Sequence, residues 1–220
     1  MTIFGYITVA LVGYLLGSIP TGYLVAKAHG LDIRKLGSGN IGATNVFRSV
    51  GKMLGVFVFV VDALKGYVAC AWVGALVIKL WPATSLDSVQ QSLPIIAGVA
   101  AILGHNYTCW LGFKGGKGIA TSAGVLLSLF PKALLVVLGI WLVVFALGRY
   151  VSLASIVAAF WLPILVWVFG YNQHCVLIAI VLSAMAIYRH KSNIKRLIAG
   201  TENRFGQKKS DVPQSPLPPT

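Results

Sequence analysis

Residues 93–130 read LPIIAGVAAILGHNYTCWL, then GFKGGKG, then IATSAGVLLSLF, so a polar loop at 112–118 separates two apolar segments. The loop combines four glycines with Lys114 and Lys117. Glycine allows backbone N–H groups to approach a ligand closely, and the lysines add positive charge at the same place. We therefore expect the loop to bind a phosphate group and the flanking segments to enter a bilayer.

The composition of the whole chain is that of a membrane protein. Of its 220 residues, 57% are hydrophobic and 10% are charged, whereas about 25% charged residues is usual in a soluble domain. The net charge of +13 comes from 18 Lys and Arg against 5 Asp and Glu. Because the bases lie between apolar runs, they indicate cytoplasmic loops facing anionic lipid or substrate, and no nucleic-acid partner is expected. Three scattered cysteines predict neither a disulfide framework nor a zinc site.

Seven apolar segments are predicted, and the first is expected to be a retained span because no signal-peptide pattern precedes it. They cover about residues 3–26, 53–78, 93–111, 119–130, 133–148, 151–169 and 174–188. With the N-terminus outside, 15 of the 18 basic residues are cytoplasmic. Merging the two short segments at Pro131 would move the seven C-terminal bases outside, against the positive-inside bias. The predicted fold is an all-α integral membrane protein, a seven-transmembrane helix bundle with its N-terminus outside and its C-terminus cytoplasmic.

Two regions follow from this organisation. Residues 1–205 are predicted to form the membrane domain, and residues 206–220 a disordered, proline-rich cytoplasmic tail. The polar and glycine-rich loops all lie on the cytoplasmic side in this topology. A site is therefore expected to open inward.

A second glycine-rich stretch is GSGNIGATNVFR at residues 37–48. Its hydroxyls, amides and backbone N–H groups can surround an oxyanion, and Arg48 offers two parallel hydrogen bonds to a phosphate. The alternative is an ordinary turn between helices that ends in a topology-setting arginine. The candidate ligand residues in this stretch are Ser38, Asn40, Asn45 and Arg48.

Further candidates come from the last two segments. His190 and Asn193 are three residues apart and are expected to share one helical face, where the imidazole can donate to a phosphate oxygen. The alternative is a basic anchor beside the membrane, which already accounts for the neighbouring Lys and Arg. Ser152 and Ser155 also share a face, although serines in membrane helices usually bond their own backbone or allow close packing.

Asp62 and Lys65 are ionisable residues inside the second segment and are expected to pair at the i, i+3 spacing. Charges inside a membrane usually face a bundle interior and serve function, although a purely structural ion pair is the alternative. His105 is interpreted as a polar residue at a helix end, at the membrane interface beside Tyr107 and Trp110. It is retained as a candidate site residue.

Acidic residues are scarce, and this limits the chemistry. The five acids never lie within four positions of one another, so no carboxylate cage for Mg²⁺ and no metal site is predicted. A serine-nucleophile elbow is absent as well. The remaining inventory is a cationic pocket with hydroxyl, amide and backbone donors, and it suits a reaction between phosphorylated reactants with little proton transfer by the protein.

Taken together, these motifs resemble the bacterial membrane acyl-phosphate:glycerol-3-phosphate acyltransferase family. The resemblance rests on GSGNIGATNVFR, GHNYTCWLGFKGGKGIAT and RHKSNIKRL, with DALKG between the first two, and covers about residues 13–197. It implies transfer of a fatty acyl group from acyl phosphate to the sn-1 hydroxyl of glycerol 3-phosphate, giving lysophosphatidic acid and phosphate. No cofactor is expected, and a bacterial plasma membrane location with a cytoplasmic active site is implied.

The resemblance also assigns roles to residues of this sequence. Catalytic roles fall to Ser38, Arg48, Lys117, His190 and Asn193, and substrate binding to Asn40, Asn45, Lys114, Gly115, Gly116, Gly118 and Ser155. One departure is Thr108, where the family commonly has proline, so the helix end before the glycine loop is open to a different shape. A peripheral enzyme that makes acyl phosphate is the expected partner on the cytoplasmic face. Alternatives are an inward-opening organic-phosphate transporter and an acyltransferase that uses acyl-carrier protein or acyl-CoA.

Overall fold

The computed structural model describes residues 3–80 and 87–206 of the chain. All regular structure in these two ranges is helical. The chain divides into two compact units, Met1–Leu134 and Leu135–Thr220. The predicted disordered tail, residues 206–220, lies outside the described residues apart from Gly206.

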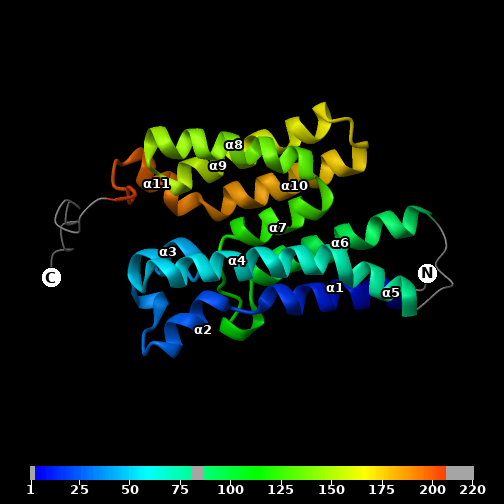
Figure 1. Ribbon diagram of the computed structural model, residues 1–220, viewed down its shortest axis with the longest axis horizontal. Helices are drawn as coiled ribbons and strands as arrows, with labels where there is room; N and C mark the ends of the chain where they lie inside the picture. Colours follow the sequence, from blue (N-terminus) through cyan, green and yellow to red (C-terminus); the bar gives the residue numbers. More distant parts are fainter. Residues whose placement is uncertain (1–2, 81–86, 207–220) are drawn as a thin grey trace. The chain divides into compact units, whose positions relative to one another are not determined.

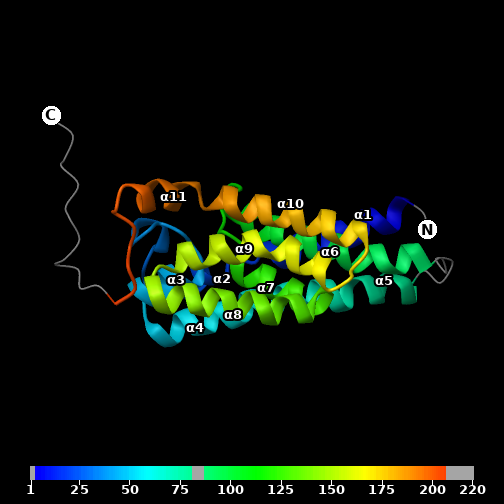
Figure 2. The ribbon, with the colours of Figure 1, turned by 90° about the horizontal axis from the view of Figure 1, so that it is seen from above.

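The helices follow one another along the chain with short connections (Figures 1 and 2). Those of the first unit are α1 (Ile3–Ser18), α2 (Thr21–Ala28), η1 (Ile33–Lys35), α3 (Ala43–Ser49), α4 (Lys52–Val68), the π-helical turn η2 (Ala69–Val73), α5 (Gly74–Leu80), α6 (Asp87–Asn106), η3 (Cys109–Leu111) and α7 (Ile119–Leu129). Helix α8 (Pro131–Gly148) leads into the second unit, which continues with α9 (Val151–Val168), α10 (Gln173–Arg189) and α11 (Lys191–Ile198).

Each of the seven predicted apolar segments is helical, and the two short ones are separate helices. Helix α7 ends at Leu129, Phe130 leaves the helical region with φ −136° and ψ 57°, and α8 begins at Pro131. Among the described helices, four stretches are long and apolar enough to cross a membrane: Ile3–Ala28, Lys52–Val77, Pro131–Gly148 and Val151–Val168. The pair α10–α11, bent by 57°, would be a fifth, and α7 is a shorter apolar helix.

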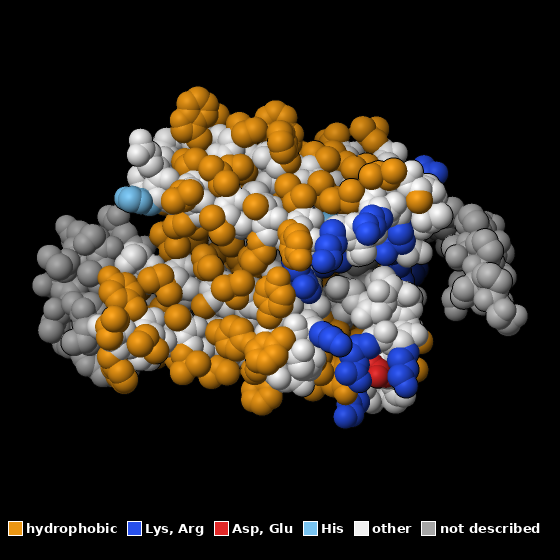
Figure 3. All heavy atoms as spheres, turned by 180° about the vertical axis from the view of Figure 1, so that it is seen from behind, with side chains coloured by type: hydrophobic (Ala, Val, Ile, Leu, Met, Phe, Trp, Pro, Cys, Tyr) orange, Lys and Arg blue, Asp and Glu red, His pale blue; other side chains and the backbone are white. Residues whose placement is uncertain are grey.

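Large apolar side chains cover the outside of these helices. Trp72 is 67% exposed, Leu135 70% and Leu147 79%, and Figure 3 shows apolar side chains over much of the visible face. A soluble monomer rarely exposes apolar patches of this extent, because each would cost free energy in water. Such a surface is stable in contact with lipid tails. The chain is therefore an integral membrane protein.

Helices α1 and α6 are in backbone contact along a line of small residues. Side chains added at Gly13 and Gly17 of α1 would collide with the backbone of Ala97 and Ala101 of α6. The matching order of the two pairs shows that α1 and α6 run parallel. Small residues spaced four apart let membrane helices approach closely, where dispersion contacts hold them together.

Helix α4 runs opposite to α1 and α6. Asp62 of α4 meets Thr21 at the start of α2, while Lys65, one turn later, meets Ile19 just before it. Because direction alternates from α1 to α4 to α6, the connection between α2 and α4 and the glycine loop after α6 lie at the same end of the first unit. Figures 1 and 2 both place the α2–α3 region at the end of this unit away from the N-terminus.

In the second unit, α10 packs on α9, and α11 contacts both. Residues after α11 then return to the corner between α8 and α9. There the Phe205 N–H donates to the Arg149 carbonyl at 2.7 Å, and the Phe205 ring lies edge-on to Phe145. This return holds the end of the described chain against the helix corner.

Candidate functional site

The site in the first unit begins at the break between α1 and α2. Pro20 has no N–H, so the helix stops there, and the Ile19 carbonyl accepts a hydrogen bond from the Lys65 ammonium at 2.8 Å. Lys65 also contacts Asp62 at 2.7 Å, and Asp62 in turn accepts from the Thr21 hydroxyl at 3.1 Å. Asp62 and Lys65 are both buried. The predicted ion pair is therefore present, and it ties α4 to the break between α1 and α2.

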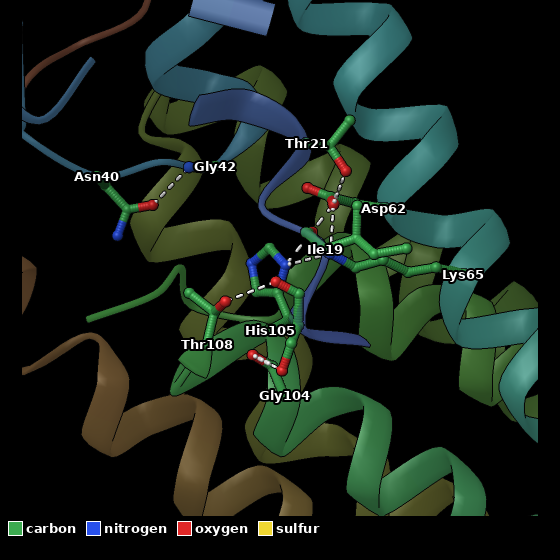
Figure 4. A network of polar contacts seen from close by, with 10 residues as sticks. Ile19, Thr21, Asn40, Gly42, Asp62, Lys65, Gly104, His105 and Thr108 are labelled. Carbon is green, nitrogen blue, oxygen red and sulfur yellow. Dashed lines mark hydrogen bonds and ion pairs between the residues drawn. The ribbon is translucent and has the colours of Figure 1, made fainter. Parts of the chain in front are cut away.

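His105, at the end of α6, joins this ion pair. Its Nδ1 lies 3.1 Å from Lys65 Nζ and 3.7 Å from Asp62 Oδ1. Figure 4 shows the three side chains together. His105 is only 5% exposed. The interpretation of His105 as a residue at the membrane interface beside Tyr107 and Trp110 is therefore wrong. The contact with α4 buries it inside the helix bundle.

The glycine loop folds back over the end of α6 and is held there by backbone hydrogen bonds. The Gly115 N–H donates to the Asn106 carbonyl at 3.1 Å, and the Gly116 N–H donates to the His105 carbonyl at 2.9 Å. A side chain at Gly116 would collide with His105 Nε2. Gly118 adopts a φ of 78°, which favours glycine, where the chain turns into α7. Glycine is needed at position 116 because the loop lies directly on His105, and at position 118 because of the backbone conformation.

The two lysines of the loop differ in exposure. Lys114 is exposed, whereas Lys117 is half-buried next to the start of α7. The first turn of a helix presents unpaired N–H groups and the positive end of the helix dipole. Lys117 therefore adds its charge where backbone donors are already oriented, an arrangement suited to an oxyanion.

Thr108 stands where the family commonly has proline, yet the backbone there keeps a conformation that proline can adopt. Its φ of −63° and ψ of 128° lie within the range that proline adopts. Its hydroxyl also donates to the Ser18 carbonyl at 2.6 Å, a bond that proline cannot make. Threonine thus keeps the proline-like bend and adds a contact to the end of α1.

The stretch 37–48 is a tight turn followed by α3, and the Asn45 side chain organises it. Asn45 Nδ2 donates to the carbonyls of Leu36 at 2.9 Å and Asn40 at 2.8 Å, while its Oδ1 accepts from the Ser38 N–H at 3.1 Å. Asn40 in turn accepts from the Gly42 N–H at 2.9 Å (Figure 4). Asn45 is buried, and its side chain bonds to backbone groups of the turn. In this structure it therefore acts as a turn-forming residue.

This turn leaves the predicted ligand groups accessible. Ser38 is exposed, Asn40 is half-buried, and Arg48 is exposed in the last turn of α3. Gly37 and Gly39 adopt φ values of 54° and 68°, which close the turn beneath Ser38. A hydroxyl, an amide and a guanidinium are thus carried on one compact segment.

An exposed ion pair precedes the turn. Arg34 donates to both oxygens of Asp32, from Nε at 2.9 Å and from Nη2 at 2.8 Å. These hydrogen bonds from the Arg34 side chain lower the pKa of Asp32 from 3.8 to about 2. The carboxylate is therefore ionised at any physiological pH, and it also caps η1 by accepting from the Arg34 N–H.

In the second unit, Asn193 is held by an acid that sequence reasoning missed. Glu202 accepts from Asn193 Nδ2 at 2.6 Å, from the Ser152 hydroxyl at 2.8 Å and from Arg196 Nε at 2.7 Å. It is buried, although it follows α11 in a polar segment. The signal in the sequence was its isolation, since Glu202 is the one acid in an otherwise basic stretch at 189–205.

His190 marks the bend between α10 and α11. It caps the end of α10 and the start of α11, and Asn193 lies in the first turn of α11, so a shared helical face for His190 and Asn193 stays a prediction. Its Nδ1 lies 2.8 Å from the Ala186 carbonyl, to which it must donate. Ser155 donates to the Val151 carbonyl and accepts from Trp141 Nε1, and the first of these bonds is the usual backbone bond of a helix serine.

Known proteins match this chain along most of its length. The sequence model of the glycerol-3-phosphate acyltransferase family matches residues 7–200. The glycerol-3-phosphate acyltransferase of Synechococcus sp. (strain JA-3-3Ab) is 44% identical over 205 residues, covering 93% of this chain and 95% of that protein. The protein of the same name from Aquifex aeolicus (strain VF5) is 45% identical over 193 residues, covering 87% and 95%.

Solved structures agree with the sequence matches. The crystal structure of PlsY, an integral membrane glycerol 3-phosphate acyltransferase, in its glycerol 3-phosphate form, has a TM-score of 0.80 and 42% identity over 91% of this chain and 96% of that chain. Its lysophosphatidic acid form gives 0.78 and 42%, over 91% and 95%. With the family model spanning nearly the whole membrane region and the relatives above 40% identity, the chain belongs to the glycerol-3-phosphate acyltransferase family.

Proposed function

We propose that this protein transfers a fatty acyl group from acyl phosphate to the sn-1 hydroxyl of glycerol 3-phosphate, giving lysophosphatidic acid and inorganic phosphate. The observation that carries the proposal is the match to a structure solved in a glycerol 3-phosphate form, at 42% identity over 91% of this chain. The same neighbour was solved in a lysophosphatidic acid form, which corresponds to the proposed product.

The proposed roles of the residues follow the family resemblance and the chemistry of their side chains. Arg48 and His190 hold the phosphate of glycerol 3-phosphate, and Lys117, beside the N–H groups where the glycine loop enters α7, holds the acyl phosphate. Ser38 and Asn193 supply further hydrogen bonds to the reacting groups. Additional binding contacts come from a wider set of residues, namely Asn40, Asn45, Lys114, Gly115, Gly116, Gly118 and Ser155. The arrangement of this set around two substrates is part of the proposal.

The reaction needs one proton transfer. The sn-1 oxygen attacks the acyl carbonyl carbon, an ester C–O bond forms, and the C–O bond to phosphate breaks. Asp62 is buried and accepts hydrogen bonds from Lys65 and Thr21, so it is poorly suited to act as the base. The hydroxyl proton therefore passes to a phosphate oxygen of a substrate, while fixed donors stabilise the developing charge.

We further propose seven spans with the N-terminus outside and the active site facing the cytoplasm of a bacterial plasma membrane. The alternation of direction from α1 to α4 to α6 supports this arrangement, because it places the α2–α4 connection and the glycine loop at one end. An enzyme that makes acyl phosphate would then deliver the donor to the basic cytoplasmic face. The acyl chain would lie between helices in the bilayer.

Donor choice in a purified system tests the proposed reaction. The protein is reconstituted in liposomes with glycerol 3-phosphate and, in separate reactions, acyl phosphate, acyl-CoA or acylated carrier protein. We expect lysophosphatidic acid and stoichiometric inorganic phosphate with acyl phosphate alone. Product from acyl-CoA or acylated carrier protein without acyl phosphate would overturn the donor assignment. Accumulation of labelled glycerol 3-phosphate inside sealed vesicles without any donor would instead support a transporter.

A further inference from the structure

We infer that His105 presents a neutral Nε2–H donor to a phosphate group bound at the glycine loop, and that Lys65 and Asp62 are positioning residues that fix this tautomer. The inference rests on the proposed function, which assigns the loop to phosphate binding. It adds His105 to the phosphate-binding residues. The contacts of its Nδ1 atom inside the helix bundle determine that the proton is on Nε2.

The ammonium group of Lys65 determines the protonation of the ring. An ammonium has three hydrogens and no acceptor. Around Lys65 Nζ lie three acceptors: an Asp62 oxygen at 2.7 Å, the Ile19 carbonyl at 2.8 Å and His105 Nδ1 at 3.1 Å. Each hydrogen therefore has one partner, and the His105 Nδ1 atom must accept.

A ring nitrogen that accepts carries no hydrogen, so the proton of His105 is on Nε2. A doubly protonated ring would direct an Nδ1–H at the Lys65 ammonium, which repels it. The alternative of Nδ1–H donating to Asp62 is ruled out by the 3.7 Å separation, which is too long for a hydrogen bond. The hydrogen-bond network thus assigns a neutral ring with an Nε2–H donor.

The Nε2 atom faces the glycine loop. A side chain added at Gly116 would collide with Nε2 before any other atom, while the Gly116 N–H is bonded to the His105 carbonyl. Figure 4 shows the ring with one nitrogen toward the Asp62–Lys65 pair and the other pointing away from it. Glycine at position 116 therefore keeps side-chain atoms away from Nε2, and the ring nitrogen lies directly against the loop.

A neutral donor suits the proposed chemistry better than a cationic one. In that reaction a phosphate oxygen accepts the hydroxyl proton, and an imidazolium nearby would compete by giving up its own proton. A neutral Nε2–H is a very weak acid and so donates a hydrogen bond without transferring the proton. The buried Asp62–Lys65 pair has no net charge, so it orients the ring without adding to the charge at the loop.

Two isosteric substitutions separate the ring nitrogens. In His105→Gln the side-chain amide can reach the Nε2 position, whereas in His105→Asn it reaches only the Nδ1 position and leaves the loop without a donor. Because hydrogen bonds to charged groups are strong, we expect His105→Asn to raise KM for the phosphate substrate held by the loop by roughly 10- to 100-fold. His105→Gln should raise KM by a factor at least about tenfold smaller than the factor for His105→Asn. KM for acyl phosphate and for glycerol 3-phosphate, measured separately, identifies which substrate uses the donor.

The tautomer itself is measured without turnover by ¹⁵N NMR of histidine-labelled wild-type protein, with the His105 signals assigned by their loss in His105→Gln. We expect a protonated Nε2 and an unprotonated Nδ1, a shift of the Nε2 signal when inorganic phosphate is added, and a changed pattern in Lys65→Met. An Nδ1–H tautomer, or no response to phosphate, would overturn the inference. So would equal KM values for folded His105→Asn and His105→Gln. If the wild type shows these signals but does not use acyl phosphate, the proposed function fails alone.

Discussion

His105 and His190 offer different atoms to a ligand because different ring nitrogens are engaged. His190 Nδ1 must donate to the Ala186 carbonyl, so a neutral His190 has Nε2 as an acceptor and needs a second proton to donate to phosphate. His105 Nδ1 accepts from Lys65, which leaves Nε2–H as a donor in the neutral ring. A phosphate contact by His190 is therefore coupled to its protonation, whereas one by His105 is not.

Lys117 and Lys114 give a matched pair within the same loop. Lys117 is half-buried at the start of α7, and Lys114 is exposed. A cation beside oriented backbone donors in partial shelter from water is worth more than one in solvent. We expect Lys117→Ala to lower kcat/KM by roughly 100-fold or more, and Lys114→Ala to have a clearly smaller effect. Acyl-phosphate-dependent product formation measures both, with circular dichroism to confirm folding, and equal losses would contradict the assignment.

Sequence reasoning found the residues whose partners are close along the chain. The i, i+3 spacing of Asp62 and Lys65 was enough to predict their contact, which is 2.7 Å. The burial of His105 was missed because its partner Lys65 lies 40 residues away on α4. Glu202 was missed for the same reason, since its contact with Ser152 depends on how the chain returns after α11.

At the scale of elements, the parallel contact of α1 with α6 depends on glycine. A side chain at Gly17 would collide with the Ala101 backbone, which has no rotamer to change. We expect Gly17→Val to destabilise the protein by about 1–3 kcal/mol, the usual cost of overpacking, seen as a lower thermal unfolding midpoint in detergent. Gly139→Ala on α8 is the control, because nothing lies within 4 Å of an added Cβ there. A midpoint unchanged by Gly17→Val would contradict this contact.

The segment after α11 is held by Glu202, which accepts from three side chains. In Glu202→Gln the new amide group would face a donor, and Arg196 would lose its counter-charge. We expect a loss of about 1–3 kcal/mol in unfolding free energy, allowing for the partial exposure of Arg196, and slower turnover through a displaced Asn193. Thermal unfolding measures the first effect and kcat the second.

Asp32→Asn is the matched control for Glu202→Gln, because it also removes one carboxylate from an arginine pair. That pair lies on an exposed loop, so its loss should leave the midpoint near the wild-type value. A similar drop in both variants would show that net charge, not the buried hydrogen bonds, is responsible.

Element boundaries followed from hydropathy and proline, but bends did not. The separation of α7 from α8, predicted from the distribution of basic residues, is present at Pro131, where a proline cannot continue the hydrogen bonding of the preceding helix. The bend of 57° between α10 and α11 could not be predicted in the same way, because no proline or glycine lies at His190. Packing on α9 and the anchor at Glu202 decide the direction of α11, and neither is local in sequence.

At the scale of the whole molecule, the orientation in the membrane is open to a direct test. A variant without Cys70, Cys109 and Cys175 receives one cysteine, either at His29 in the connection after α2 or at Gln173 at the start of α10. In intact cells a membrane-impermeant maleimide should label Gln173→Cys and not His29→Cys, which should react only after lysis. Labelling of His29→Cys and not Gln173→Cys in intact cells would show that the topology is the reverse of the one proposed. Equal labelling of both sites in intact cells would contradict the seven-span arrangement.

The return of residues 201–206 to the corner of α8 and α9 has a practical consequence for handling the protein. The Phe205 N–H is bonded to the Arg149 carbonyl, so a load applied through the C-terminus reaches that corner first among the described residues, in the unit that carries His190 and Asn193. Immobilisation through the C-terminus therefore pulls on the Glu202 anchor. Attachment at the N-terminus, ahead of α1, applies no load to that anchor and is the better choice for binding measurements on a sensor surface.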